Sequence, residues 1–260
     1  MAVALVTGAG KRLGRAMALY LARRGYDLAV HYANSATEAS EVVAEARAMG
    51  RQAEAFQADL LDEAATEGLF PRVAAAFDTP VTCLVNNASV FEYDRLETAT
   101  RTSWDRHFNS NLRAPFVLTQ AMAAQVPEAT RDENGELMPQ GLVVNMVDQR
   151  VRKLTPEFMT YTLAKMGLWT FTQTAALGLA PHVRVNAIGP GTTLIGARQT
   201  QDHFDAQRQR SILQRGANVS DITAALGFFL DSPAVTGQLI CADGGQHLAW
   251  QTPDIINKRG

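Results

Sequence analysis

Short runs of apolar and β-branched residues alternate with longer helical patterns along the whole chain. The apolar runs predict strands over residues 2–7, 27–32, 52–59, 82–87, 141–147, 182–188 and 238–243. The patterns between them predict helices over 13–25, 36–50, 62–77 and 102–126, and another that carries Tyr161 and ends at about residue 179. This alternation is typical of a parallel sheet, because parallel strands need crossover helices. Right-handed crossovers then predict an α/β fold with a doubly wound parallel sheet of about seven strands and helices on both faces.

The 260 residues are 47% hydrophobic, which is enough chain for one large core. We expect a single domain over 1–260, because no linker rich in proline or glycine interrupts the pattern. Two segments have no regular periodicity. Residues 127–141 are polar and rich in turn formers, which indicates a surface connection. Residues 190–216 follow the carboxyl end of a predicted strand, where substrate lids commonly sit.

Charge and composition argue against several classes of function. The formal net charge of −2 and the absence of a basic run argue against nucleic acid or a polybasic membrane role. No apolar run approaches the ~20 residues of a membrane span, and the chain enters a strand pattern too early for a secretory signal. Cys83 and Cys241 lie among apolar neighbours, so we expect core cysteines in a reducing, cytoplasmic compartment. The histidines show no metal-ligand spacing, so we assign no metal.

Gly8, Gly10 and Gly14 lie between the first predicted strand and the first predicted helix. Glycines there allow a tight turn, a close approach to a pyrophosphate and close packing of the helix on the sheet. The helix start then presents free N–H groups and a positive dipole end to the phosphates. An ordinary glycine-rich turn is the alternative. The position at the start of the chain, between a strand and a helix, favours dinucleotide binding.

The end of the second predicted strand indicates which dinucleotide binds. NAD-binding sites usually carry an acidic residue there for the ribose hydroxyls. This chain has Asn34 and Ser35 instead, and Lys11, Arg12 and His31 could offset the charge of a 2′-phosphate. NADP(H) is therefore favoured, with solvated loop cations as the alternative interpretation of Lys11 and Arg12.

Tyr161 and Lys165 are four residues apart on a predicted helix, so they share one face. An ammonium beside a phenol stabilises the phenolate and lowers its pKa from about 10, which suits proton transfer at neutral pH. Taken alone, the pair could also be a chance meeting on a solvated helix. Asp148 ends a buried apolar run. It could face this pair, or it could only cap the following loop.

In sequence order these motifs resemble the short-chain dehydrogenase/reductase family, whose members have a Rossmann fold, over nearly the whole chain. The matching residues are Thr7-Gly8 to Gly14, Asp59-Leu60, Asn86-Asn87-Ala88, Asn111, Tyr161-x-x-x-Lys165, Pro190-Gly191 and Asp243-Gly244-Gly245. The resemblance implies a proton relay of Asn111, Tyr161 and Lys165, with Asp59 beside the adenine. It also implies that the cofactor contacts are Gly8, Arg12, Leu13, Gly14, His31, Asn34, Ser35, Asp59, Leu60, Asn87, Ala88, Ser89, Tyr161, Lys165, Pro190 and Gly191.

Two departures from the commonest family pattern are similar to the pteridine reductase subgroup. Arg12 replaces a glycine of the usual motif, and Asp148 replaces the usual serine. The resemblance implies NADPH-dependent reduction of a pterin or dihydropterin, with Arg12, Ser89, Phe91, Asp148 and Tyr161 contacting the substrate. It also implies a homotetramer. Asn34 stands where known members carry an arginine.

The chemistry of a pterin explains why a carboxylate would stand at this position. The ring nitrogens of a pterin must be protonated as a C=N bond is reduced, and Asp148 could pass protons through Tyr161 or a water. A reductase of a small carbonyl compound or sugar is the alternative function. A non-catalytic NADP-binding sensor is a further alternative, but a sensor has no need of the intact pair of Tyr161 and Lys165.

Overall fold

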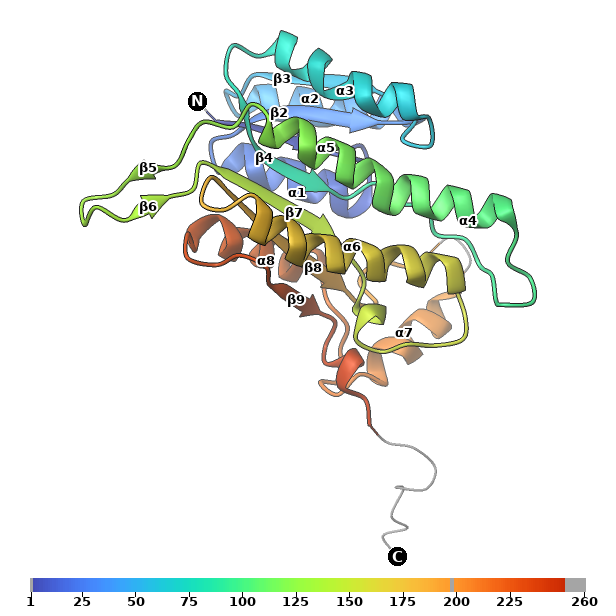
Figure 1. The fold of residues 1–260 in the computed structure, drawn as a ribbon. Helices are drawn as coiled ribbons and strands as arrows, with labels where there is room; N and C mark the ends of the chain where they lie inside the picture. Colours follow the sequence, from blue (N-terminus) through green and yellow to red (C-terminus); the bar gives the residue numbers. More distant parts are fainter. Residues whose placement is uncertain (1, 197–198, 251–260) are drawn as a thin grey trace, which may run out of the picture.

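The computed structural model describes residues 2–196 and 199–250. Its main sheet has seven parallel strands in the order β3-β2-β1-β4-β7-β8-β9 (Figure 1). After β3, at one edge of the sheet, the chain crosses to β4, which lies beside β1. The strands are β1 (Val3–Val6), β2 (Asp27–Tyr32), β3 (Ala53–Gln57), β4 (Val81–Asn86), β7 (Gly141–Met146), β8 (Val183–Pro190) and β9 (Leu239–Ala242). The predicted doubly wound parallel sheet is therefore confirmed.

Helices cover both faces of the sheet, and each face has its own apolar cluster. One cluster joins the sheet to α1 (Arg12–Arg23), α2 (Ala36–Ala48) and α8 (Val219–Asp231). The other joins it to α3 (Glu63–Ala76), α5 (Ala114–Ala123) and α6 (Met159–Gly178). Strands covered on both sides are apolar along their whole length, which is why β1 and β7 are buried at every position.

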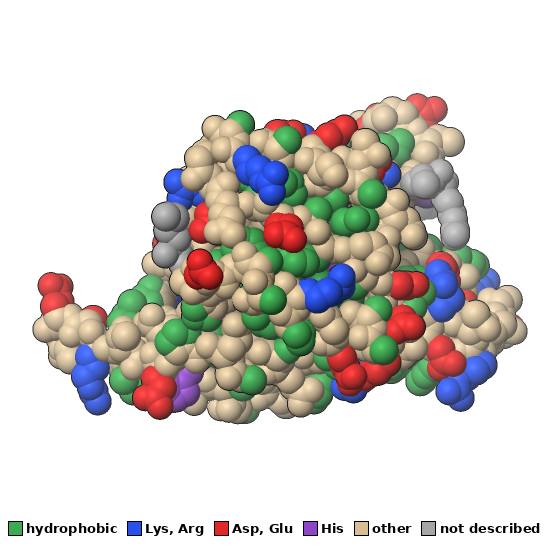
Figure 2. All heavy atoms as spheres, turned by 90° about the horizontal axis from the view of Figure 1, so that it is seen from above, with side chains coloured by type: hydrophobic (Ala, Val, Ile, Leu, Met, Phe, Trp, Pro, Cys, Tyr) green, Lys and Arg blue, Asp and Glu red, His purple; other side chains and the backbone are tan. Residues whose placement is uncertain are grey.

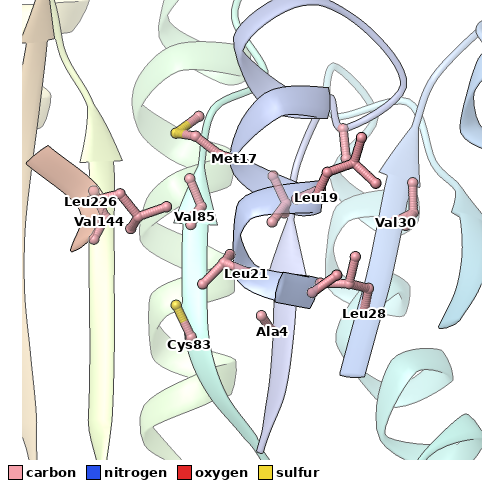
Figure 3. Packing of buried hydrophobic residues seen from close by; sticks show 14 of the residues in the cluster. Ala4, Met17, Leu19, Leu21, Leu28, Val30, Cys83, Val85, Val144 and Leu226 are labelled. Atoms are coloured by element: carbon pink, nitrogen blue, oxygen red, sulfur yellow. The ribbon is translucent and has the colours of Figure 1, made fainter. Parts of the chain in front are cut away.

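The packing of α1 shows how this core forms (Figure 3). Met17 and Leu21 face β4, which carries Cys83 and Val85, and all four side chains are buried. Burial of a side chain such as Leu21 contributes about 1.5–3 kcal/mol. Cys83 is a core residue, as the sequence predicted, and burial raises the pKa of its thiol to about 12.

The predicted helix over 102–126 is interrupted. It consists of α4 (Arg101–Phe108), the five-residue π-helix η1 (Asn109–Arg113) and α5. Pro115 follows directly and has no N–H for the α-helical bond to the carbonyl of Asn111, so the α-helical ladder cannot continue there. π-Helical turns of this kind are frequent at functional sites.

One hairpin and two α-helices lie where the sequence predicted none. Residues 127–141 contain the short hairpin of β5 (Thr130–Arg131) and β6 (Leu137–Met138), which projects from the body (Figure 1). Residues 190–216 contain α7 (Gln201–Gln209). The second of these helices, α8, is preceded by a capping box of Asn218 and Asp221, a sequence signal that would have predicted its start.

Candidate active site

The carboxylate of Asp148 makes two contacts at the end of β7. Its Oδ1 accepts the backbone N–H of Arg150 at 2.8 Å, which caps the short 3₁₀ helix η2 (Gln149–Val151). Its Oδ2 accepts the hydroxyl of Tyr161 at 3.0 Å. The two interpretations of Asp148, loop cap and partner of the tyrosine, are therefore both present in one side chain.

Burial dominates the acid–base properties of this pair. Burial, followed by the charge of Asp148, raises the pKa of Tyr161 well above 10. Burial also raises the pKa of Asp148 above 3.8, although the Arg150 N–H opposes the change. The expectation that Lys165 lowers the pKa of the phenol is wrong for this arrangement, because burial and the negative charge of Asp148 raise that pKa. The phenol therefore keeps its proton at neutral pH and can act as an acid.

Lys165 lies one turn further along α6, on the same face as Tyr161. Its Nζ donates to the carbonyl of Met146 at 2.7 Å and lies 5.7 Å from the centroid of the Tyr161 ring. Burial lowers the pKa of Lys165 to about 8, and Asp148 opposes that shift. An amine with this pKa can gain or lose a proton near neutral pH.

Asn111 lies in the π-helix and is fully buried. Its Oδ1 accepts the N–H of Val90 at 2.9 Å, and its Nδ2 donates to the carbonyl of Val90 at 2.8 Å. Both polar ends of the side chain are therefore occupied by the loop that carries Ser89 and Phe91. Within the described residues, the hydrogen bonds of the Asn111 side chain are with Val90, so Asn111 positions that loop.

Phe91 lies beside the tyrosine and is 51% exposed. Its ring meets the Tyr161 ring edge-on, with centroids 4.7 Å apart, and stacks in parallel on Phe158 at 4.5 Å. Ser89 interacts with the phenol oxygen and slightly offsets the rise in its pKa. Phe91, Ser89, Asp148 and Tyr161 are thus brought together at one place.

The glycine loop has no room for side chains. Gly8 has a φ of +62°, and a Cβ on Gly14 would lie 2.1 Å from the carbonyl oxygen of Gly8. Asn87 holds the same turn, because its Nδ2 donates to the carbonyls of Thr7 and Gly8 at 2.9 and 3.2 Å. α1 starts directly after the loop, and Lys11 at its N-cap provides no side-chain cap, so the first N–H groups can bind an anion. These features fit the phosphates of a dinucleotide.

His31 binds the backbone of the glycine loop at Gly8. The expectation that its side chain offsets the charge of a 2′-phosphate does not fit this position. Its Nδ1 accepts the N–H of Gly8 at 3.0 Å, its Nε2 donates to the carbonyl of Ala58 at 3.1 Å, and it is only 1% exposed. Burial lowers the pKa of His31 to about 4, so the ring is neutral at pH 7.

An acidic residue that was not predicted to belong to the site lies near the end of β2. Glu38, in the first turn of α2, pairs with Lys11 across 2.7 Å. Ser35 precedes this turn, and its Oγ would lie 2.7 Å from a Cβ on Gly10. The spacing of an acid in the first turn of the second helix was the missed signal. It means that one of the two loop cations is already paired.

Arg12 reaches away from the loop. Its backbone has a φ of +53°, and its guanidinium donates to the carbonyls of Leu194 and Ile195 at 3.1 and 2.8 Å. The arginine thus joins the glycine loop to the segment that follows β8. Left-handed backbone at a residue other than glycine is uncommon and is often found at functional sites.

The remaining predicted cofactor residues lie at the carboxyl ends of strands on the same edge of the sheet. They are Leu13 in α1, Asn34 after β2, Asp59 and Leu60 after β3, Ala88 after β4, and Pro190 and Gly191 at the end of β8. Asp59 accepts the N–H of Leu61 at 3.0 Å, and Leu60 packs into the core. A Cβ on Gly191 would lie 2.5 Å from the Cβ of Asp243, so the close approach of these two segments requires glycine. Ligands of open α/β sheets bind along this edge.

Further observations concern other kinds of site. Within residues 2–196 and 199–250, no group of three or more His, Cys, Asp or Glu side chains is placed to hold a metal ion. No helix in those ranges is both long and apolar enough to cross a membrane. On the face shown in Figure 2, basic and acidic side chains are interspersed.

Known proteins resemble the chain along most of its length. In sequence, it is 31% identical to the 3-oxoacyl-[acyl-carrier-protein] reductase FabG of Staphylococcus aureus, covering 94% of this chain and 98% of that one. It is also 32% identical to Pteridine reductase 1 of Leishmania tarentolae, covering 95% and 96%. In structure, it matches FolM Alternative dihydrofolate reductase 1 from Brucella suis in complex with NADP, at 40% identity, a TM-score of 0.90 and 98% coverage of both chains.

The family model described as short chain dehydrogenase matches residues 2–206. The matched region contains the glycine loop as well as Asp148, Tyr161 and Lys165. This chain therefore belongs to the short-chain dehydrogenase family of oxidoreductases.

Proposed function

We propose that this protein reduces a pterin or dihydropterin with NADPH. The observation that carries the proposal is the hydrogen bond between the Asp148 carboxylate and the Tyr161 hydroxyl at 3.0 Å. A ketone reductase needs a neutral hydroxyl at this position, whereas reduction of a C=N bond needs protons delivered to nitrogen. The exposed ring of Phe91 offers a surface on which a flat substrate can stack.

The proton relay uses the raised pKa values of both partners. NADPH, when bound, supplies the hydride that reduces the C=N carbon. As Tyr161 donates its proton to the ring nitrogen, the Asp148 carboxylate takes up a proton from water and returns it to the phenolate. Because two neighbouring anions repel each other, the pair of Asp148 and Tyr161 retains at least one proton, and its titration belongs to the pair. Lys165 stands behind the phenol and can pass protons to water.

The residues proposed to hold NADPH surround the glycine loop. Gly8, Gly14, Asn87 and the start of α1 would contact the phosphates, with Asn34 and Ser35 at the adenosine ribose. Arg12 would contact both pyrophosphate and substrate by releasing the carbonyls of residues 194 and 195, to which it donates. The structure of the similar FolM protein in complex with NADP supports NADP(H) as the cofactor.

Turnover on a substrate panel tests the proposal. NADPH oxidation is followed with dihydromonapterin, dihydrobiopterin, dihydrofolate and simple ketones. The wild-type protein should turn over at least one pterin, and Asp148→Ser should lose pterin reduction far more than any side activity on ketones. Brisk ketone reduction by a wild type that ignores every pterin would contradict the proposal.

Reduction of a small carbonyl compound is the second candidate. The likeness to 3-oxoacyl-[acyl-carrier-protein] reductases supports it, because those proteins also align over 94% of this chain. The panel above separates the two candidates, since each predicts a different class of substrate.

We also propose that the protein acts as a cytoplasmic homotetramer and that residues 190–216 cover the substrate. The contact of Arg12 with residues 194 and 195 supports the covering role. Exposed apolar side chains on neighbouring helices support the oligomer: Phe116 of α5 is 37% exposed and Leu163 of α6 is 42% exposed.

A further inference from the structure

A chain of buried polar side chains lies behind the tyrosine and joins three elements. Asp94 lies in the loop after β4, downstream of Ser89 and Phe91. His107 lies in α4, and Thr160 directly precedes Tyr161 in α6. All three side chains are buried. We call this hydrogen-bonded series the Asp94–Thr160–His107 chain.

The hydrogen bonds of this chain have one consistent direction. The N–H of Glu92 donates to His107 Nε2 at 3.1 Å, so a neutral imidazole carries its proton on Nδ1. Nδ1 then donates to Thr160 Oγ1 at 2.7 Å, and the Thr160 hydroxyl donates to Asp94 Oδ2. Each group in the chain is satisfied by the next, with the carboxylate as the final acceptor.

Asp94 also caps the helix that carries the tyrosine. The N-cap of α6, Phe158, provides no side-chain cap. Asp94 Oδ1 accepts the N–H of Thr160 at 3.2 Å, and its backbone carbonyl accepts the N–H of Phe158 at 2.8 Å. Phe158 is held at a φ of +56°, an uncommon backbone conformation that the stack on Phe91 accompanies. The loop after β4 thus holds the first turn of α6.

Two rings contact the ring of Tyr161. The imidazole of His107 meets the Tyr161 ring edge-on, with centroids 5.9 Å apart, and Phe91 meets it from another direction at 4.7 Å. We propose that Asp94, Thr160 and His107 are positioning residues that set the Tyr161 hydroxyl against Asp148 and the substrate. This inference rests on the proposed function only in taking Tyr161 as the proton donor.

Substitutions in α6 separate positioning from simple packing. Thr160→Val keeps the shape of the side chain and removes its hydroxyl, which breaks the chain at its centre. We expect kcat to fall by about 10- to 100-fold, with NADPH affinity and the KM for substrate little changed, because a misplaced catalytic group costs about that much. Thr160→Ser should restore most of the lost turnover.

Thr162→Val is the matched control. Thr162 lies two residues further along the same helix and is buried, but its hydroxyl has no hydrogen-bond partner within the described part of the chain. This variant should keep the wild-type kcat. Equal kcat values for Thr160→Val and Thr162→Val would overturn the inference. Turnover is measured on whichever pterin or ketone the wild type reduces, so failure of the pterin proposal leaves this test intact.

The tautomer of His107 provides a second test that needs no substrate and no variant. ¹⁵N NMR of histidine-labelled wild-type protein at pH 7 should show a neutral His107 with its proton on Nδ1. A proton on Nε2, or a charged imidazolium, would overturn the inference even if Thr160→Val did not fold.

Discussion

At the scale of single residues, the site combines roles that the sequence presents as alternatives. Asp148 caps a loop and accepts the Tyr161 hydroxyl with different oxygens of one carboxylate. Its burial has a cost in stability, since the pKa of Asp148 is raised above 3.8. A carboxyl group with a raised folded-state pKa favours folding when it is protonated, and that contribution is lost as the pH rises through the folded-state pKa.

Asp148→Asn should therefore separate stability from activity. The amide keeps the shape and an acceptor without a buried charge, so the melting temperature at pH 7 should exceed that of wild type. This advantage should shrink as the pH falls, because Asp148 in the wild type becomes protonated as the pH passes through its raised pKa. Turnover of a pterin should fall by about 10²-fold or more, because the relay loses a proton carrier. Thermal melts from pH 4 to 8 and steady-state kinetics measure the two effects. A melting temperature below that of wild type at pH 7 would contradict the predicted gain in stability.

Tyr161→Phe tests the proton donor itself. The ring and its contacts with Phe91 and His107 remain, while the hydroxyl is lost. We expect kcat to fall by about 10²- to 10⁴-fold, the usual contribution of a general acid, with little change in NADPH affinity. Stopped-flow hydride transfer and a fluorescence titration with NADPH provide the measurements. Near-normal turnover would show that the proton comes from another group.

His31 predicts a pH dependence of folding. Its pKa of about 4 in the folded protein lies below the ordinary value of 6.5. The stability linked to His31 is therefore complete above pH 6.5 and is lost as the pH falls through 4, to a total of about 3 kcal/mol. His31→Asn retains an acceptor for the Gly8 N–H and does not titrate. Its unfolding free energy should fall less steeply than that of wild type between pH 6.5 and 4, as measured by urea unfolding. Parallel curves would refute this assignment.

At the scale of elements, neighbouring helices and loops fix one another around the site. The first turns of α1 and α2 are joined by Lys11 and Glu38, the start of α6 is capped by the loop after β4, and the π-helix holds the same loop through Asn111. These contacts link segments far apart in the chain. Substitution in one element should therefore change ligand binding by another.

Glu38→Gln tests this coupling between elements at the ion pair of Lys11 and Glu38, beside the proposed cofactor site. The change frees Lys11, which can then pair with a 2′-phosphate. NADPH should bind about two- to fivefold more tightly, the scale of an exposed ion pair, and the gain should decrease at high salt. NADH lacks the phosphate and should show no change, which makes it the internal control in a fluorescence titration. An equal gain in affinity for both cofactors would show that Lys11 does not pair with the 2′-phosphate.

At the scale of the whole molecule, the proposed tetramer can be tested by light scattering. Leu163→Glu puts a charge on the exposed apolar face of α6, so the mass should fall below that of four chains, because a buried unpaired charge is costly in an interface. Leu137→Glu makes the same change at another exposed leucine, in the projecting β5–β6 hairpin, and should leave the mass unchanged. An unchanged mass for Leu163→Glu would remove α6 from the interface.

Much of this architecture follows from the sequence alone, because its signals are local. The alternation of apolar runs and helical patterns predicted the parallel sheet, and Gly8 and Gly14 predicted the glycine loop at the start of α1. Spacing along a helix placed Tyr161 and Lys165 on one face. Local signals also existed for parts that were missed, such as the capping box before α8 and Pro115 after the π-helix.

Only the tertiary structure decided the electrostatics and the partners. Asp148 reaches Tyr161, Glu38 pairs with Lys11, and Asp94 caps α6 because the fold brings together residues from separate elements. The pKa of Tyr161 rises where the sequence suggested a fall, since burial and the distances among several charges set its value. Periodicity along the chain contains the information for secondary structure, but burial and charge separation exist only once the chain has folded.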